Sequence, residues 1–202
     1  MFSKRYQLVV AFTMFLAGIA LAFFMSSQEP PQYATPATQV GGRPAPSQGE
    51  GLAATLPPAL PSPAAFEGPD GKDVVLDDFK GQWVIVNFWA TWCQPCIAEM
   101  PALGRMLEAM GKGAPKFVAI SIDAMGRAAA EPFAKSKGWT HVTAYADPKS
   151  DLYRSFASPG IPLTLVFDPE GREVARRLGP AKWDGEFVTG QIKRLMARQP
   201  IS

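Results

Sequence analysis

Residues Val84 to Pro101 read VIVNFWATWCQPCIAEMP, and this stretch decides the fold. It opens with a short apolar run rich in β-branched and aromatic residues, which predicts a buried strand. Its second half begins a segment with apolar residues three and four positions apart, which predicts a helix over residues 94–110. The only two cysteines of the chain, Cys93 and Cys96, therefore lie where a strand passes into the first turn of a helix.

The first turn of a helix favours a reactive sulfur. The first amide N–H groups of a helix have no partner within it, and the helix dipole adds partial positive charge there. Both effects stabilise a thiolate at Cys93, so we expect its pKa to lie below the free value of about 8.5. Cys96 lies one turn away on the same face, within reach of a disulfide. The pattern favours a redox-active pair.

Two other interpretations of the cysteines are open. A purely structural disulfide would stabilise the fold little, because closing a loop of about four residues contributes only about 2 kcal/mol in the chain-entropy model. Two isolated core cysteines are the second alternative. A CxxC pair that comes soon after a buried strand is the specific context of redox motifs, which favours redox chemistry over both alternatives.

The residues around the cysteines resemble a known superfamily. The segment from Trp92 to Cys96, WCQPC, looks like the active site of thioredoxins, and the flanking NFWATW and EMP are similar to the TlpA/ResA/CcmG (DsbE) branch. A GPAKW run over residues 179–183 is similar to TlpA in particular. Members of this branch are membrane-anchored, extracytoplasmic thiol-disulfide oxidoreductases. The resemblance implies a thioredoxin-like α/β fold: a central mixed sheet flanked by helices, with an N-terminal β-hairpin and a central insertion.

The rest of the sequence pattern fits this fold. The apolar positions of the first long helix are Ile97, Met100, Leu103, Leu107 and Met110. We expect an edge strand at 74–76 and the central strand at 82–89. Further strands are expected at 116–122, 141–145, 163–167 and 172–178, and further helices at 127–137, 147–156 and 183–198.

Glu99 is the candidate proton-handling residue. On spacing alone, a glutamate one turn after Cys96 is better explained as a solvated surface residue. The resemblance implies instead an active-site glutamate that handles protons for the cysteine pair, so Cys93, Cys96 and Glu99 form the expected catalytic set. Asn87 occupies a strand position where cytoplasmic thioredoxins have a buried aspartate, and an asparagine cannot carry a proton. If Glu99 has this role, it is partly buried and its pKa lies near the operating pH.

Pro162 directly precedes an apolar strand, where its missing N–H costs no ladder hydrogen bond. The resemblance implies that the Ile161–Pro162 bond is cis and lies beside the cysteines, leaving the Ile161 backbone free to pair with an extended substrate. The following Leu163 departs from the Thr or Glu often found there, which leaves the choice of partner open. The expected substrate-binding residues are Trp92, Gln94, Pro95, Ile161 and Pro162.

The N-terminal region predicts an anchor and a linker. Lys4 and Arg5 precede an uncharged, mostly apolar span whose centre would extend about 27 Å as a helix, near the hydrocarbon thickness of a bilayer. We therefore expect a cytoplasmic tail at 1–5, a transmembrane anchor at 6–28, a flexible Pro/Ala/Gln-rich linker at 29–60 and a thioredoxin-like domain at 61–202. The alternative is a cleaved signal peptide.

Either interpretation places the cysteines outside the cytoplasm, where disulfides persist. With an uncleaved anchor, the protein is a single-pass protein of the inner (cytoplasmic) membrane, with its N-terminus in the cytoplasm and its catalytic domain periplasmic. The net charge of +2 is too small for a nucleic-acid surface. One histidine and two cysteines cannot form a four-ligand zinc site, so we expect no metal and no cofactor.

The resulting hypothesis is a monomeric reductase of disulfide-containing partner proteins. The resemblance implies partners in cytochrome oxidase copper-site assembly, such as a copper chaperone or oxidase subunit, or apocytochrome c. It also implies a membrane electron donor of the DsbD/CcdA type. One alternative is a periplasmic disulfide oxidase, although such oxidases usually have a histidine between the cysteines, where this chain has Gln94 and Pro95. The other is a non-enzymatic copper-delivery module, which the missing His/Met ligand set disfavours.

Overall fold

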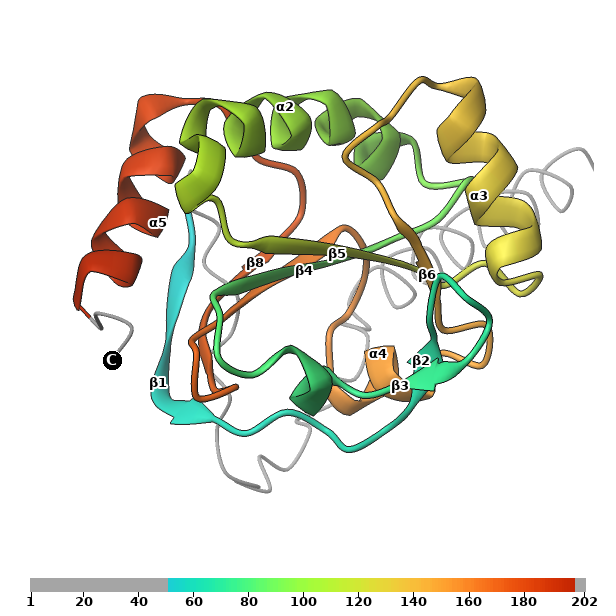
Figure 1. Ribbon diagram of the computed structural model, residues 1–202, viewed down its shortest axis with the longest axis horizontal. Helices are drawn as coiled ribbons and strands as arrows, with labels where there is room; N and C mark the ends of the chain where they lie inside the picture. The colour runs from blue at the N-terminus through green and yellow to red at the C-terminus, as the bar shows by residue number, and fades with distance from the viewer. Residues whose placement is uncertain (1–50, 199–202) are drawn as a thin grey trace, which may run out of the picture. The chain divides into compact units, whose positions relative to one another are not determined.

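The computed structural model describes residues 51–198, which are drawn in colour in Figure 1. The expected tail at 1–5, the anchor at 6–28 and most of the linker at 29–60 lie outside the described residues. Within residues 51–198, no helix combines the length and apolar character that crossing a membrane requires.

An eight-stranded mixed sheet forms the centre of the fold (Figure 1), with the strand order β1-β8-β7-β4-β5-β6-β2-β3. Strand β4 (Val84–Trp89) runs parallel to β5 (Lys116–Ser121) and antiparallel to β7 (Leu163–Phe167). All residues of β4 are buried, as expected for a strand covered on both faces. The remaining strands are β1 (Ala53–Ala59), β2 (Phe66–Glu67), β3 (Asp73–Val74), β6 (Ala144–Ala146) and β8 (Glu173–Leu178).

Helices cover both faces of the sheet. One face carries α2 (Gln94–Met110), α3 (Arg127–Ser136) and α5 (Glu186–Arg198), while the other carries the short α4 (Asp151–Ser155) and the 3-10 turn η1 (Leu76–Phe79). A second 3-10 turn, η2 (Gly111–Gly113), follows α2.

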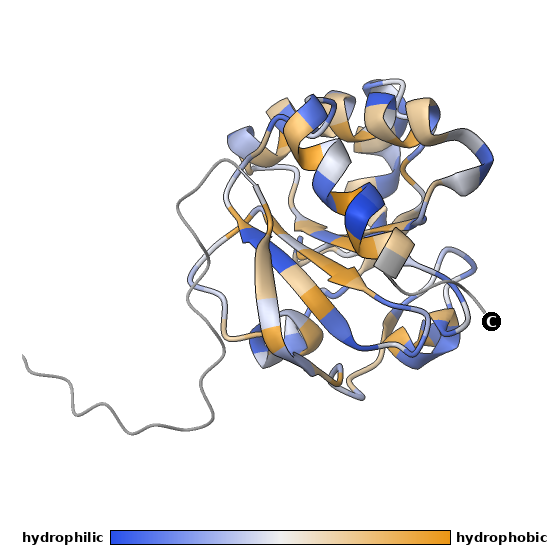
Figure 2. Cartoon of the chain, turned by 90° about the vertical axis from the view of Figure 1, so that its left-hand side faces the viewer, coloured by the Kyte–Doolittle hydropathy of each residue, from blue (hydrophilic) through white to orange (hydrophobic). Residues whose placement is uncertain are grey.

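An apolar cluster fills each layer. The cluster beneath α2 contains Trp89 and Leu103, and the cluster beneath α4 contains Phe88 and Phe156. Trp89 and Phe88 are neighbours in β4, and successive side chains of a strand point to opposite faces. Orange, hydrophobic residues are accordingly frequent on the strands in Figure 2.

This architecture agrees with the sequence interpretation. The expected N-terminal hairpin is the antiparallel pair β2–β3, and the insertion between β5 and β7 contains β6 and α4. Helix α2 begins at Gln94 and ends at Met110, as predicted, and is followed by Gly111 with φ of 57°. The closing helix begins later than expected, at Glu186, because residues 182–185 form a turn in which the Gly185 N–H donates to Lys182 C=O.

The expected boundary between linker and domain is wrong at residues 53–59, which form β1 in the sheet rather than linker. Pro57 and Pro58 made this segment look like linker, but proline is tolerated at a sheet edge. β1 lies at one edge of the sheet and pairs with β8 in an irregular register. Its Thr55 is 2% exposed, and the hydroxyl donates to a Glu173 carboxylate oxygen at 2.8 Å. This tertiary contact could not be read from local composition.

Candidate active site

The two cysteines form a disulfide at the start of α2, with their Cα atoms 5.3 Å apart. Cys93 is the N-cap residue of the helix, and its Sγ atom accepts the backbone N–H of Cys96 at 3.3 Å. The structure thus confirms the expected position at the free amide groups of the first turn. Cys93 is 5% exposed and Cys96 is fully buried, so Cys93 is the sulfur that a partner can reach.

Three of the expected substrate-binding residues surround Cys93 on the surface. Gln94 and Pro95 are exposed, and Trp92 presents 64% of its surface to solvent. A large exposed aromatic side chain next to the reachable sulfur is suited to contact a partner protein.

The Ile161–Pro162 peptide bond is cis, as predicted. It immediately precedes β7, whose first residue, Leu163, is paired with Phe88 near the end of β4. Ile161 packs against the apolar cluster that includes both cysteines. Within residues 51–198, neither backbone polar group of Ile161 has a hydrogen-bond partner, so both are available to a substrate strand.

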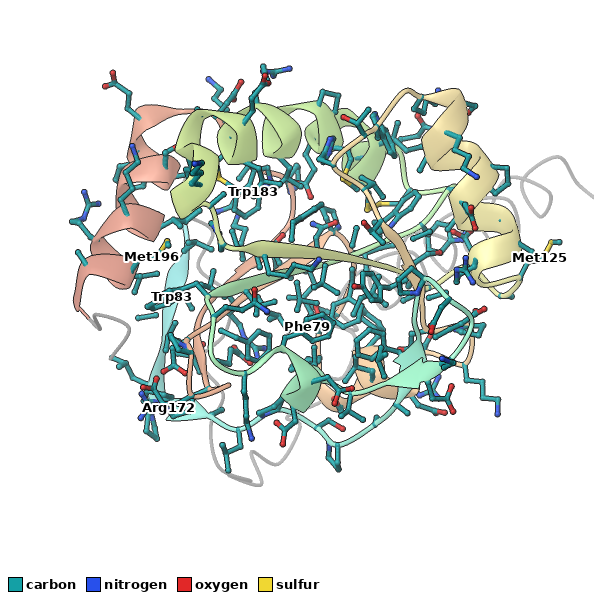
Figure 3. All side chains as sticks on the ribbon, viewed as in Figure 1. Phe79, Trp83, Met125, Arg172, Trp183 and Met196 are labelled. Carbon is teal, nitrogen blue, oxygen red and sulfur yellow. A yellow bond between two sulfur atoms is a disulfide. The ribbon has the colours of Figure 1, made fainter. Side chains whose placement is uncertain are left out.

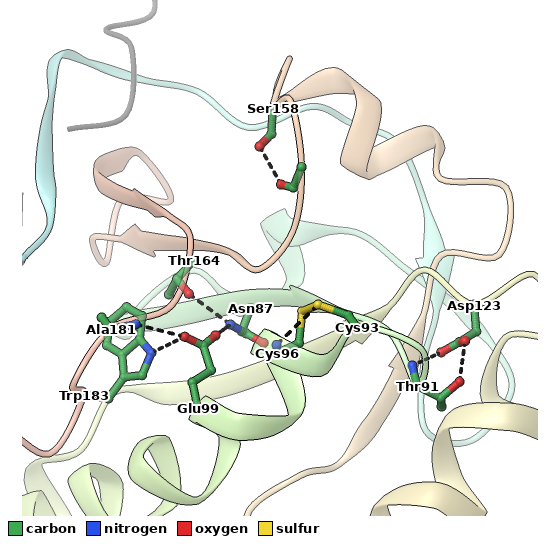
Figure 4. The surroundings of a disulfide bond; sticks show 11 residues. Asn87, Thr91, Cys93, Cys96, Glu99, Asp123, Ser158, Thr164, Ala181 and Trp183 are labelled. Carbon is green, nitrogen blue, oxygen red and sulfur yellow. Dashed lines mark hydrogen bonds between the residues drawn. A yellow bond between two sulfur atoms is a disulfide. The ribbon is translucent and has the colours of Figure 1, made fainter. Parts of the chain in front are cut away.

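Glu99 is buried beneath α2, with 4% of its surface exposed. One carboxylate oxygen, Oε2, accepts hydrogen bonds from the Trp183 indole Nε1 at 2.8 Å and from the Ala181 backbone N–H at 3.2 Å. The other, Oε1, accepts from the Asn87 amide Nδ2 at 3.1 Å. Figure 4 shows this group beside the disulfide. The expectation of burial is confirmed.

Burial raises the pKa of Glu99 from its ordinary value of 4.5 to about 7. Removing the carboxylate from water penalises the charged form, and this is the largest effect. The hydrogen bonds from Trp183, Asn87 and Ala181 and the positive charge of Arg177 act in the opposite direction. The result is a carboxyl group that both accepts and releases a proton near neutral pH.

Asn87 connects Glu99 to the sheet. Its Nδ2 atom also donates to the Thr164 hydroxyl at 3.0 Å, and the two residues are directly paired across β4 and β7. The carbonyl oxygen Oδ1 of Asn87 is buried and has no hydrogen-bond partner among the described residues. Rotating the amide by half a turn would place this acceptor, instead of Nδ2, opposite Glu99 and Thr164.

Sequence reasoning missed several residues of this site. Trp183, which is labelled in Figure 3, is fully buried, and its indole N–H donates to Glu99. Thr164 and Ala181 lie outside the set of site residues that the sequence predicts. A buried tryptophan needs an acceptor for its N–H, and that requirement was the available signal for Trp183.

Asp123 is a further residue that was missed. Its carboxylate accepts the Thr91 backbone N–H at 2.9 Å and the Thr91 hydroxyl at 2.7 Å, and Ser121 donates to the same group at 2.7 Å. Asp123 is 5% exposed. It ties the turn that precedes Cys93 to the end of β5 and so holds the nucleophile's loop in place. Across residues 51–198, no cluster of His, Cys, Asp and Glu is arranged to hold a metal ion.

Comparison with known proteins identifies the family. The pattern described as the AhpC/TSA family matches residues 60–179, more than half of the chain. The chain belongs to the AhpC/TSA family. Among its curated relatives, the thiol-disulfide oxidoreductase ResA of Bacillus subtilis (strain 168) is 30% identical over 109 residues, which are 54% of this chain and 60% of ResA. The sporulation thiol-disulfide oxidoreductase A of the same strain is 26% identical over 125 residues, 61% of this chain and 74% of that protein.

Solved structures support the same fold for this AhpC/TSA member. StoA from Bacillus subtilis superposes with a TM-score of 0.52 at 24% identity, covering 68% of this chain and 98% of StoA. A DsbF homologue from Corynebacterium diphtheriae superposes with a TM-score of 0.58 at 23% identity, covering 78% and 99%. The thioredoxin-like fold and the resemblance to the ResA branch are therefore confirmed, and the relatives' names support the expected enzyme class. The chain spans only 60% of the length of ResA.

Proposed function

We propose that this chain is a thiol-disulfide oxidoreductase that reduces disulfides in partner proteins outside the cytoplasm. One observation carries the proposal: a disulfide in the first turn of α2 lies one helical turn from a buried glutamate whose pKa is about 7. This arrangement pairs a reachable sulfur with a proton acceptor suited to neutral pH. Two of its relatives, the thiol-disulfide oxidoreductase ResA and the sporulation thiol-disulfide oxidoreductase A, support the same activity.

The first step is nucleophilic attack by the reduced protein. The Cys93 thiolate attacks one sulfur of a partner disulfide, the partner's S–S bond breaks, and the other partner sulfur leaves as a thiolate. A mixed disulfide then joins Cys93 to the partner. The backbone N–H of Cys96, which contacts Cys93 Sγ, stabilises the thiolate before attack.

The second step releases the reduced partner. The buried Cys96 thiol gives its proton to the Glu99 carboxylate, directly or through water, and the resulting thiolate attacks Cys93 Sγ. The Cys93–Cys96 disulfide forms and the partner leaves as a thiolate, so two electrons have passed to the partner. Once protonated, Glu99 can donate to Asn87 Oδ1 after the amide rotates, which satisfies an acceptor that otherwise has no partner in the described region.

We also propose where this protein lies and with which proteins it reacts. The uncharged span at 6–28 behind Lys4 and Arg5 supports a single-pass anchor in the inner membrane, with the domain on the periplasmic side. Each turnover leaves the cysteines oxidised, so a membrane electron donor of the DsbD/CcdA type must reduce them again. Substrates of the proposed monomer are a copper chaperone or copper-site subunit of cytochrome oxidase, or apocytochrome c. The GPAKW run favours the copper-site proteins.

The variant Cys96→Ser tests the reaction and identifies the partner. This variant can form the mixed disulfide but cannot resolve it, so it is expected to accumulate covalently bound partners that a reducing agent releases. Non-reducing electrophoresis followed by mass spectrometry measures the adduct. The double variant Cys93→Ser, Cys96→Ser is the control and should trap nothing. Absence of an adduct with Cys96→Ser would contradict attack by Cys93.

The reduction potential separates a reductase from an oxidase. We expect a value of about −200 to −280 mV, because no histidine lies between the cysteines to stabilise the Cys93 thiolate further. Equilibration of the full chain with glutathione buffers, followed by quantification of free thiols, measures the potential. A value near about −120 mV would instead assign the chain as a disulfide oxidase.

A further inference from the structure

The first part of the loop between β8 and α5, residues 179–183, supplies two of the hydrogen bonds that Glu99 accepts. Both reach the same oxygen, Oε2: one comes from the Ala181 backbone and one from the Trp183 indole. The loop is also fixed at its start, where the Gly179 N–H donates to the Pro162 carbonyl oxygen at 2.8 Å. The position of this loop therefore controls how well the Glu99 carboxylate is hydrogen-bonded.

Arg177 also binds the backbone of this loop. Its Nη2 atom donates to the Pro180 carbonyl oxygen at 2.9 Å, and its Nη1 atom donates to the Gly51 carbonyl oxygen at 3.3 Å. Arg177 is directly paired with Thr164 in the sheet, and Thr164 is directly paired with Asn87. Directly opposed residues point to the same face of a sheet, so Arg177 projects toward the face on which Glu99 lies.

Arg177 also supplies charge. The groups that contact Glu99 from β4 and from the 179–183 loop are the neutral Asn87, Ala181 and Trp183, and β7 adds the neutral Thr164 behind Asn87. On α2, Cys96 lies three positions before Glu99. Its sulfur is bonded to Cys93 in the disulfide and therefore has no proton to lose. From β8, the positive charge of Arg177 favours the charged form of Glu99 and opposes the effect of burial on its pKa.

We propose that Arg177 is a positioning residue for the thiol-disulfide reaction: it holds the 179–183 loop against Glu99 and supplies the charge that keeps this carboxyl group able to accept a proton. The inference rests on the function proposed above, since proton acceptance by Glu99 matters only if the cysteines react. In this role Arg177 acts through Glu99 and not on the reacting sulfur atoms.

The direct test is the titration of Glu99, followed by the carbon-13 chemical shift of its carboxyl group in the oxidised full chain. In Arg177→Met, which keeps an unbranched apolar stem, the pKa of Glu99 is expected to rise by about half a unit or more. Arg177→Lys keeps the charge and should restore at least half of that rise. The matched control is Arg105→Met, which removes an exposed cation paired with Asp184 and should leave the titration unchanged.

Turnover provides a second readout. When the pKa of Glu99 rises, a smaller fraction of Glu99 is ionised at pH 7, so Arg177→Met is expected to reduce disulfides more slowly by about twofold or more. The same substitution should have no effect when Glu99→Gln is already present. An unmoved Glu99 titration in Arg177→Met, or an equal loss in the Glu99→Gln background, would overturn the role of Arg177. Absence of turnover in the unaltered chain would overturn the proposed function, whatever the titration shows.

Discussion

Replacing Cys93 with serine is expected to abolish disulfide reduction, because a hydroxyl at this position is not ionised at neutral pH and cannot displace a thiolate from a disulfide. The rate should fall to the background of the reductant alone. This loss should be larger than the loss caused by substituting any residue other than the two cysteines. The measurement is reduction of insulin by the full chain in the presence of dithiothreitol. The fold should survive, since the short disulfide loop contributes only about 2 kcal/mol.

Cys96 cannot replace Cys93 in this experiment, because it is fully buried whereas Cys93 is 5% exposed. Cys96→Ser is therefore the matched control: it should lose turnover as well, but it should still form the mixed disulfide. If Cys93→Ser kept even a tenth of the rate while Cys96→Ser trapped no partner, the roles of the two sulfurs would have to be exchanged.

Replacing Glu99 with glutamine is expected to slow the resolving step by about 100-fold at pH 8, because the amide cannot take the proton from Cys96. In the unaltered chain, Glu99 is protonated below its pKa of about 7 and is then unable to accept a proton. The resolving rate of the unaltered chain should therefore rise as the pH increases through 7, and this rise should be absent in Glu99→Gln. Single-turnover release of a partner from the mixed disulfide, measured from pH 6 to pH 8, gives both quantities.

Glutamine at position 99 should remove the proton acceptor and leave the fold intact, because the site can accommodate its amide. Its carbonyl oxygen can accept from Trp183 and Ala181, and its N–H can donate to Asn87 Oδ1 once that amide rotates. The matched control is Glu108→Gln, on the exposed face of the same helix, which should change the rate by less than about twofold. Equal pH profiles for Glu99→Gln and the unaltered chain would remove Glu99 from the mechanism.

The position of Glu99 on α2 illustrates what a periodic pattern can miss. The expected stripe consists of the apolar residues Ile97, Met100, Leu103, Leu107 and Met110, and it does not include Glu99. The structure buries a slightly rotated stripe of α2, formed by Cys96, Glu99, Met100, Leu103 and Met106. A glutamate within that stripe has no water to solvate it, so it is hydrogen-bonded by other elements.

The sequence by itself determined the local features of this protein. Short-range patterns predicted the passage from a buried strand into a helix at Cys93, the extent of α2 and the start of β7 after a proline. They succeed because neighbouring residues decide where strands, turns and helices begin and end. These features placed both sulfurs at the start of a helix. They also carry the resemblance to the TlpA/ResA/CcmG branch.

Only the tertiary structure decided the chemistry of Glu99 and the start of the domain. The loop partners of Glu99, Ala181 and Trp183, lie 82 and 84 residues away along the chain, and β1 enters the sheet through Thr55, whose partner Glu173 is 118 residues away. A pKa depends on burial and on the charges and donors that surround a group in space. No local pattern encodes those surroundings, so they emerge only when distant segments pack together.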